Sequence, residues 1–184
     1  MKWLNEEKVN SVLGIDASTH SVAYCLNTPS GIKTYGEIMF SGETVFERLA
    51  DAQKQIPQLL GHLDYDMILF ESAVYIQNKR TVILLAYSFG AVLGALVKPG
   101  VAVHDISPLV WQPAIGNRAL TKEEKIQIQL DHPGKSKSWY SNKQREFRKQ
   151  RTKDWVTKNY GLQVATDNIS DAIAISHVGV DTYC

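Results

Sequence analysis

The sequence contains little cysteine, no long apolar run and almost no net charge, and each shortage narrows the class of protein. Two cysteines, Cys25 and Cys184, occur in 184 residues. This number favours reduced thiols in a cytoplasmic protein over a disulfide scaffold. No apolar run approaches the roughly 20 residues that span a bilayer, and the opening MKWLNEEKVN lacks the apolar stretch of a secretory signal. We therefore expect one domain over residues 1–184 with no membrane partner.

The net charge of +1 conceals an uneven distribution of basic residues. Residues 135–158 hold nine Lys and Arg but only two acids, a balance of +7, so the rest of the chain carries −6. A basic segment on a mildly acidic body is typical of a protein that binds a polyanion, although a solvated helical face has the same composition. The candidate phosphate contacts are Lys135, Lys137, Lys143, Arg145, Arg148, Lys149, Arg151 and Lys153, with Lys79 and Arg80 elsewhere in the chain.

Hydrophobic patterning predicts five strands and five helices. The expected strands are residues 11–17, 21–28, 32–40, 66–71 and 101–106. The expected helices are residues 44–62, 80–97, 121–130, 143–160 and 167–178, and the stretch after Ser107 and residues 131–142 read as irregular. Pro57 predicts a kink or an early break in the first helix.

The order of these elements predicts the architecture. Three consecutive strands form an antiparallel meander, and strands separated by helices form parallel crossovers. An α/β fold follows, with a mixed five-stranded sheet that is flanked on both faces by helices. This arrangement is typical of the RNase H-like fold.

Acidic residues lie at three positions that this fold would bring close together. Asp16 ends the first strand, Glu71 ends the fourth, and Asp167 and Asp171 share one face of the last helix. If the first and fourth strands are neighbours, their carboxyl ends open on the same side. Clustered carboxylates at the ends of apolar strands are costly without a cation, and hard oxygen ligands favour Mg²⁺ or Mn²⁺.

Each acid taken alone also fits an ordinary structural role. Asp16 could be a turn residue, Asp167 a helix N-cap and Asp171 an exposed helix position. Glu71 fits such a role less well, because an acid that directly follows Ile-Leu-Phe needs a partner. The joint order of the four acids on two strands and one helix is what favours a metal site.

Four segments resemble the RuvC-type Holliday junction resolvases. Residues 12–18, VLGIDAS, resemble the opening strand of that family, and residues 70–72, FES, resemble its fourth-strand glutamate. Residues 84–96 are similar to its long helix rich in small residues. Residues 170–177, SDAIAISH, resemble its final motif, an acid followed by alternating alanine and aliphatic residues.

The resemblance covers about residues 11–107 and 151–178, and it implies an activity. Such a protein would be a Mg²⁺-dependent endonuclease that cuts four-way DNA junctions or other branched DNA and leaves 5′-phosphate ends. Two ions per site would be bound, with Mn²⁺ as a substitute, by Asp16, Glu71, Asp171 and a fourth ligand. A homodimer and a bacterial or phage origin are also implied, and Tyr75 lies where the family uses an aromatic residue at the junction centre.

The chain departs from the family pattern at the fourth ligand. The family commonly has an acid three residues before the final Asp, where this chain has Asn168, whereas Asp167 lies four residues before it. Asp167 is the predicted ligand, with Asn168 as a weaker alternative. A second departure is the stretch 118–150, which is longer than the corresponding loop of the family, so residues 118–150 are expected to form a basic insertion within the domain. Trp139 and Tyr140, within the basic segment, either stack on unpaired bases or pack together to anchor the insertion.

Three other functions remain open on the sequence. A nuclease of the same fold acting on flaps or RNA–DNA hybrids has the same carboxylates. A non-catalytic protein that binds branched DNA would tolerate Asn168. An actin-like or sugar-kinase ATP site also resembles residues 14–21, but it needs a duplicated domain and a second phosphate loop, which 184 residues do not supply.

Overall fold

The computed structural model of the chain describes residues 9–72 and 78–184, and its centre is one five-stranded sheet. The strands are β1 (Val12–Ala17), β2 (Ser21–Thr28), β3 (Gly31–Met39), β4 (Met67–Glu71) and β5 (Ala102–Ile106). They lie in the order β3-β2-β1-β4-β5. β1 pairs antiparallel with β2 and parallel with β4. β2 and β3 are antiparallel, whereas β4 and β5 are parallel. The predicted meander, crossovers and neighbouring first and fourth strands are all confirmed.

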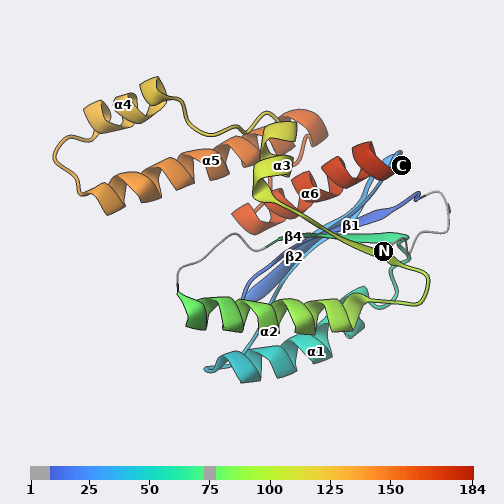
Figure 1. Cartoon of the computed structure of the whole chain (residues 1–184). Coiled ribbons are helices and arrows are strands. Elements are labelled where there is room, and N and C mark those ends of the chain that lie inside the picture. Colours follow the sequence, from blue (N-terminus) through green and yellow to red (C-terminus); the bar gives the residue numbers. More distant parts are fainter. Residues whose placement is uncertain (1–8, 73–77) are drawn as a thin grey trace.

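Helices cover both faces of this sheet (Figure 1). The helices are α1 (Val45–Leu60), α2 (Lys79–Leu96), α3 (Pro108–Ala114), α4 (Lys122–Asp131), α5 (Lys137–Tyr160) and α6 (Asp167–Tyr183). α1 and α2 pack on one face, whereas α6 lies across the other, beneath α3 and the inner part of α5. The prediction of helices on both faces is therefore confirmed.

Three local expectations were wrong. Residues 108–114 form α3 rather than an irregular segment, because Ser107 caps the helix through the Leu109 amide and Pro108 occupies its first turn. α5 begins at Lys137, six residues before its predicted start, with Ser136 as its N-cap. α1 passes through Pro57 and ends at Leu60, so the break expected at the proline does not occur there.

The two faces of β1 and β4 are buried by different partners. Leu13, Ile15 and Ile68 join a core with α1 and α2. Val12 and Leu69 join a second core with α6. Because side chains alternate between the faces of a strand, residues 16 and 71 belong to the α6 face. This alternation decides which helix can complete a site with the two strand-end acids.

Gly14 allows the α6 backbone to touch β1. A Cβ on Gly14 would lie 2.5 Å from the carbonyl oxygen of Ala172 and 2.6 Å from the amide nitrogen of Ser176. Two turns further on, a Cβ on Gly179 would lie 2.7 Å from Val12 Cγ1. The two glycines, one on each element, therefore permit a closer approach than any other residue would.

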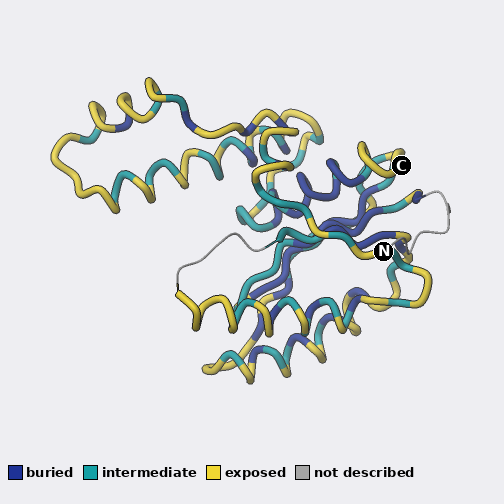
Figure 2. Tube along the Cα trace, viewed as in Figure 1, coloured by how far each residue is buried: buried dark blue, intermediate teal, exposed yellow. Residues whose placement is uncertain are grey.

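The α4–α5 arm, which comprises residues 120–147, projects away from the sheet (Figure 1). Most of its residues are exposed, in contrast with the buried turns of α6 (Figure 2). Ile128 is buried within the arm, while Ile126, Leu130 and Phe147 are 45%, 69% and 44% exposed. The arm makes up most of the predicted insertion, residues 118–150.

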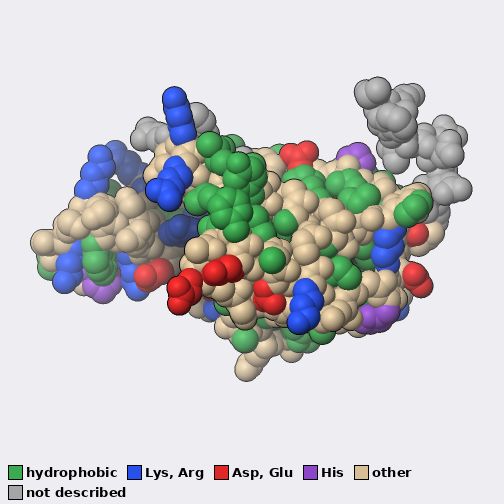
Figure 3. Space-filling model, turned by 90° about the horizontal axis from the view of Figure 1, so that it is seen from below, with side chains coloured by type: hydrophobic (Ala, Val, Ile, Leu, Met, Phe, Trp, Pro, Cys, Tyr) green, Lys and Arg blue, Asp and Glu red, His purple; other side chains and the backbone are tan. Residues whose placement is uncertain are grey.

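The outer face of α2 is apolar and exposed. Val82, Ile83 and Tyr87 are 41%, 51% and 49% exposed, and hydrophobic side chains gather on the α1–α2 side of the molecule (Figure 3). By length and composition α2 would suffice to cross a membrane, a test that core helices also pass. Its inner face packs into the core through Ser88, Val92 and Leu96.

Gly14→Ala is expected to destabilise the fold more than Gly179→Ala. The Cβ at residue 14 meets helix backbone, which cannot rotate away, so the free energy of unfolding should fall by about 3 kcal/mol. The Cβ at residue 179 meets side chains of Val12 and Leu69, which can shift, so the loss there should be smaller.

Urea unfolding of both variants measures these losses. Gly94→Ala is the matched control, because a Cβ there meets nothing within 4 Å and alanine favours a helix over glycine by about 1 kcal/mol. A Gly14→Ala protein as stable as the parent would contradict the close-packing argument.

Candidate active site

Asp16 and Glu71 come together because β1 and β4 are parallel and in register. Ile15 pairs with Phe70, so the next residue on each strand is an acid on the α6 face. Both side chains are partly buried. Burial raises the pKa of Asp16 to about 7, and the nearby Glu71 carboxylate adds to the rise.

Asp171 approaches the same point from α6. It precedes Ala172, whose carbonyl oxygen faces Gly14, so the glycine contact brings this acid to the end of β1. Burial raises the pKa of Asp171 well above its ordinary value, followed by repulsion from Asp16 and from Glu71. The structure therefore brings three of the four predicted acids into one electrostatic cluster.

Glu71 has a neutral partner on α3. The indole Nε1 of Trp111, which is fully buried, donates a hydrogen bond to Glu71 Oε2 at 2.8 Å. Burial raises the pKa of Glu71, while this bond and the charge of Arg145 lower it. The sequence analysis did not identify Trp111, because its segment was read as irregular.

Asp167 is held by two lysines of α5. Lys149 Nζ lies 2.8 Å from Asp167 Oδ2, and Lys153 Nζ lies 2.7 Å from Oδ1. Burial alone would raise the pKa of Asp167, but the bonds from these lysines lower it. Thr166, not Asp167, is the N-cap of α6. Both Asp167 oxygens are thus engaged by ammonium groups.

The amide nitrogen of Asn168 points at Glu37. No motif in the sequence marked Glu37 as part of the site. Asn168 Nδ2 donates to Glu37 Oε1 at 2.7 Å, and the hydroxyls of Thr166 and Ser21 donate to the same carboxylate at 2.6 and 2.7 Å. Burial alone would raise the pKa of Glu37, but these three bonds lower it. Glu37 stands in the cross-strand row Asp16–Ala23–Glu37, a register that only the sheet reveals.

A cleft of about 690 Å³ opens between α3 and α5 above the carboxylates. Glu71 and Asp171 lie in its lining, and Arg145, Arg148 and Lys149 of α5 contribute basic groups to it. Lys149 also lowers the pKa of both Asp16 and Asp171. Acidic and basic groups thus face one solvent-accessible volume, as binding of a phosphate together with a cation requires.

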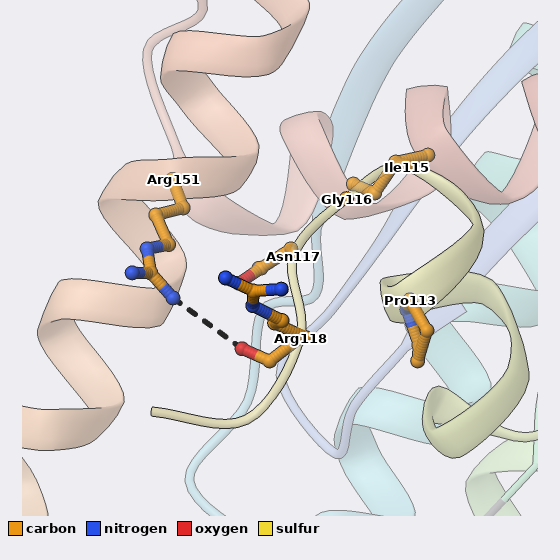
Figure 4. Close-up of a pocket in the computed structure, with 6 residues that line it drawn as sticks. All are labelled: Pro113, Ile115, Gly116, Asn117, Arg118 and Arg151. Atoms are coloured by element: carbon orange, nitrogen blue, oxygen red, sulfur yellow. Dashed lines mark hydrogen bonds between the residues drawn. The ribbon is translucent and has the colours of Figure 1, made fainter. Parts of the chain in front are cut away.

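A second, shallower pocket lies beyond α3 and contains none of the predicted acids (Figure 4). There Arg151 Nη1 donates to the carbonyl oxygen of Arg118 at 3.4 Å. Asn117 is buried and donates to the carbonyl oxygen of Arg148 and to Thr152 Oγ1. These bonds fasten the segment before α4 to α5.

The predicted phosphate contacts differ in their availability. Arg151 pairs with Glu124, Arg148 donates to Gln112, and Lys143 pairs with Glu146 at 3.0 Å. Exposed positions are held by Lys79, Arg80, Lys135, Lys137 and Arg145. Tyr75 lies outside the described residues.

The aromatic residues of the arm form a small cluster at its outer end. The Trp139 ring meets the rings of His132 and Tyr140 edge-on at centroid distances of 4.9 and 5.5 Å. Tyr140 donates its hydroxyl to the carbonyl oxygen of His132 at 2.5 Å. These contacts favour the anchoring role over base stacking for Trp139 and Tyr140.

Among the described residues, no three His, Cys, Asp or Glu side chains are arranged closely enough to hold a metal ion as they stand. The donor chemistry of Asp16, Glu71 and Asp171 nevertheless fits a hard divalent cation, because all three offer carboxylate oxygens at one partly buried point. Burial is the main cause that raises their pKa values, and repulsion from neighbouring carboxylates, which a cation would relieve, adds to the rise for Asp16 and Asp171.

Comparisons with known proteins identify the fold and then the family. No family model matches the chain. Thermus thermophilus RuvC, in a structure with a Holliday junction substrate, superimposes with a TM-score of 0.62 over 95% of this chain and 98% of that one, at 15% identity. The protein therefore has an RNase H-like fold of the RuvC type.

Sequence similarity is higher to two curated relatives. The crossover junction endodeoxyribonuclease RuvC of Syntrophomonas wolfei is 33% identical over 125 residues, which cover 65% of this chain and 71% of that protein. The RuvC of Fusobacterium nucleatum is 31% identical over 123 residues, 64% of each chain. The chain belongs to the RuvC family of crossover junction endodeoxyribonucleases, as the motifs in its sequence predicted.

We expect the metal-free protein to lose stability as the pH rises from about 4 to about 7. Asp16 has a pKa of about 7 when folded against an ordinary value of 3.8, so between these values the folded state binds the extra proton. The free energy of unfolding then falls with rising pH, by at most about 4 kcal/mol for this group.

Unfolding by urea between pH 4.5 and 8, in the presence of a chelator, tests this pH dependence. Asp16→Asn should reduce it, because asparagine does not titrate, whereas Asp171 and Glu71, whose pKa values are also raised, retain the remainder. Identical pH dependence in the parent and the Asp16→Asn protein would contradict the assignment.

Proposed function

We propose that the protein is a Mg²⁺-dependent endonuclease that resolves Holliday junctions or closely related branched DNA. The observation that carries this proposal is the cluster of Asp16, Glu71 and Asp171 at the carboxyl ends of β1 and β4, in a chain of the RuvC family. Acting on DNA, such an enzyme would work in the cytoplasm of a bacterium or of a phage-infected cell.

The three clustered acids would hold the divalent ions. Asp16 would hold both ions of a two-metal site, with Glu71 holding one of them and Asp171 the other, a role that the electrostatic coupling of these acids supports. Bound Mg²⁺, or Mn²⁺ in its place, would lower the pKa of the attacking water and neutralise charge on the leaving 3′-oxygen, leaving a 5′-phosphate. Asp167 could become the fourth ligand only by releasing Lys149 and Lys153, and Asn168 only by turning its amide oxygen from the network around Glu37.

The cleft between α3 and α5 would receive the DNA backbone. Arg145 and Lys149 present positive charge beside Glu71 and Asp171, and these groups would bind the non-bridging oxygens next to the scissile phosphate. Lys153 is turned toward Asp167, so its role would be to hold Lys149 and α6 in place. Residues 118–150 would act as a basic insertion that extends DNA contacts along the arm.

Two active sites about a two-fold axis are needed for paired cuts in a two-fold symmetric junction, which favours a homodimer. The exposed apolar face of α2 is the surface that fits this role. Gly90 and Gly94 are exposed there, and a Cβ on either meets nothing within 4 Å. They are therefore not needed for internal packing and remain available for a second helix to approach.

Asp16→Asn should abolish Mg²⁺-dependent cleavage and leave junction binding within about threefold of the parent. The substitution removes a metal ligand but none of the phosphate-binding groups. Cleavage of four-way junction, flap, duplex and RNA–DNA hybrid substrates, run in parallel with junction binding, provides the measurement.

The same parallel assay separates the competing functions. Preferred cutting of flaps or hybrids would replace the junction by another substrate, and binding without cleavage by the parent protein would indicate a non-catalytic member. Cleavage that persists in a clean Asp16→Asn preparation would refute the active-site assignment.

Lys135→Gln with Lys137→Gln should weaken junction binding and lessen its salt dependence. Each phosphate contact contributes about 0.9 to the slope of log K against log salt, so the slope should fall by as much as about 2. Lys33→Gln with Lys54→Gln removes the same charge from exposed positions on β3 and α1. Equal slopes for the two double variants would count against DNA binding by the arm.

A further inference from the structure

One buried hydrogen bond connects the hydrophobic core to the carboxylate cluster without adding charge. Trp111 is 0% exposed, and its neighbours in the core beneath α6 include Val12, Leu69 and Ile175. Its indole Nε1–H donates to Glu71 Oε2 at 2.8 Å. We propose that Trp111 is a positioning residue that fixes the Glu71 carboxylate for divalent metal binding, an inference that rests on the proposed function.

The donor properties of indole suit this task. Trp Nε1–H donates one hydrogen bond and accepts none, so it engages a single carboxylate oxygen and cannot itself ligate a cation. Glu71 Oε2 is thereby occupied, which would leave Oε1 for a cation in the cleft that Glu71 lines. A neutral donor also leaves the negative charge of Glu71 intact, whereas a Lys or Arg at this position would compete with the metal.

The surrounding packing makes the donor rigid. α3 follows β5 directly, and its first turn is capped by the Ser107 hydroxyl on the Leu109 amide. The Trp111 amide donates to the carbonyl oxygen of Ser107 at 3.1 Å, and the Ile115 amide donates to the carbonyl oxygen of Trp111 at 3.3 Å. Packing in the core restricts the Trp111 side chain to one rotamer. Because Glu71 is hydrogen-bonded to this fixed indole, its carboxylate loses rotational freedom before a cation binds.

Partners of this kind typically account for a tenfold to hundredfold change in metal affinity. Trp111→Phe keeps an aromatic ring but removes the N–H group. We expect it to weaken Mn²⁺ binding, measured by calorimetry on the intact chain, roughly tenfold to hundredfold. The Mg²⁺ concentration for half-maximal junction cleavage should rise by the same factor, while the rate at saturating Mg²⁺ changes far less.

Ile115→Ala is the matched control for lost packing. Ile115 is buried in the same cluster and ends α3, and no hydrogen bond joins its side chain to Glu71. This variant should lose stability but bind Mn²⁺ as the parent does. If Trp111→Phe folds poorly, site-specific replacement of Trp111 by benzothienylalanine preserves the shape with sulfur in place of N–H, and the same loss of affinity is expected.

The Glu71→Gln variant distinguishes failure of this inference from failure of the proposed function. The role of Trp111 would be overturned if Trp111→Phe and the benzothienylalanine protein bind Mn²⁺ as the parent does while Glu71→Gln loses affinity. That result would leave the nuclease site standing. Parent-like metal binding and cleavage by Glu71→Gln would overturn the site itself. A loss in Ile115→Ala equal to that in Trp111→Phe would assign the effect to packing and also refute the proposal.

Discussion

The close approach of the α6 backbone to β1 at Gly14 determines the geometry of the site. Side chains normally separate a helix from the sheet on which it packs. At Gly14 no side chain intervenes, and the helix carbonyl of Ala172 lies within contact of the strand. Asp171 is therefore delivered to the end of β1, where its charge meets those of Asp16 and Glu71. The family motif Gly-Ile-Asp thus couples a packing requirement to a chemical one.

Much of the fold was predictable because its signals are local or periodic. Apolar runs marked β1, β4 and β5. The expected neighbour relation of β1 and β4 followed from the crossover topology, and it placed two acids together. The resemblance to RuvC proteins rested on segments in β1, β4, α2 and α6, and the sequence comparisons confirm it.

Other features depend on tertiary contacts that a linear sequence does not display. Glu37 accepts hydrogen bonds from Thr166 and Asn168, more than 100 positions away, and only the register of three strands places it in one row with Asp16. Trp111 was overlooked because a seven-residue helix with two prolines has no clear periodicity. The pairing of Asp167 with Lys149 and Lys153 was hidden as well, because a basic run reads as solvent-facing until the packing of α5 on α6 is known.

The continuity of α5 has a mechanical consequence. This helix runs without interruption for 24 residues, about 36 Å, from the aromatic cluster at the tip of the arm to the α6 contact. A helix of that length behaves as a stiff rod, and its residues 148–153 are fixed to the domain by the Asn117 hydrogen bonds and by the two lysines on Asp167. If the arm binds DNA as proposed, a load at its tip would be transmitted through α5 to Asp167 in the first turn of α6, four residues from Asp171.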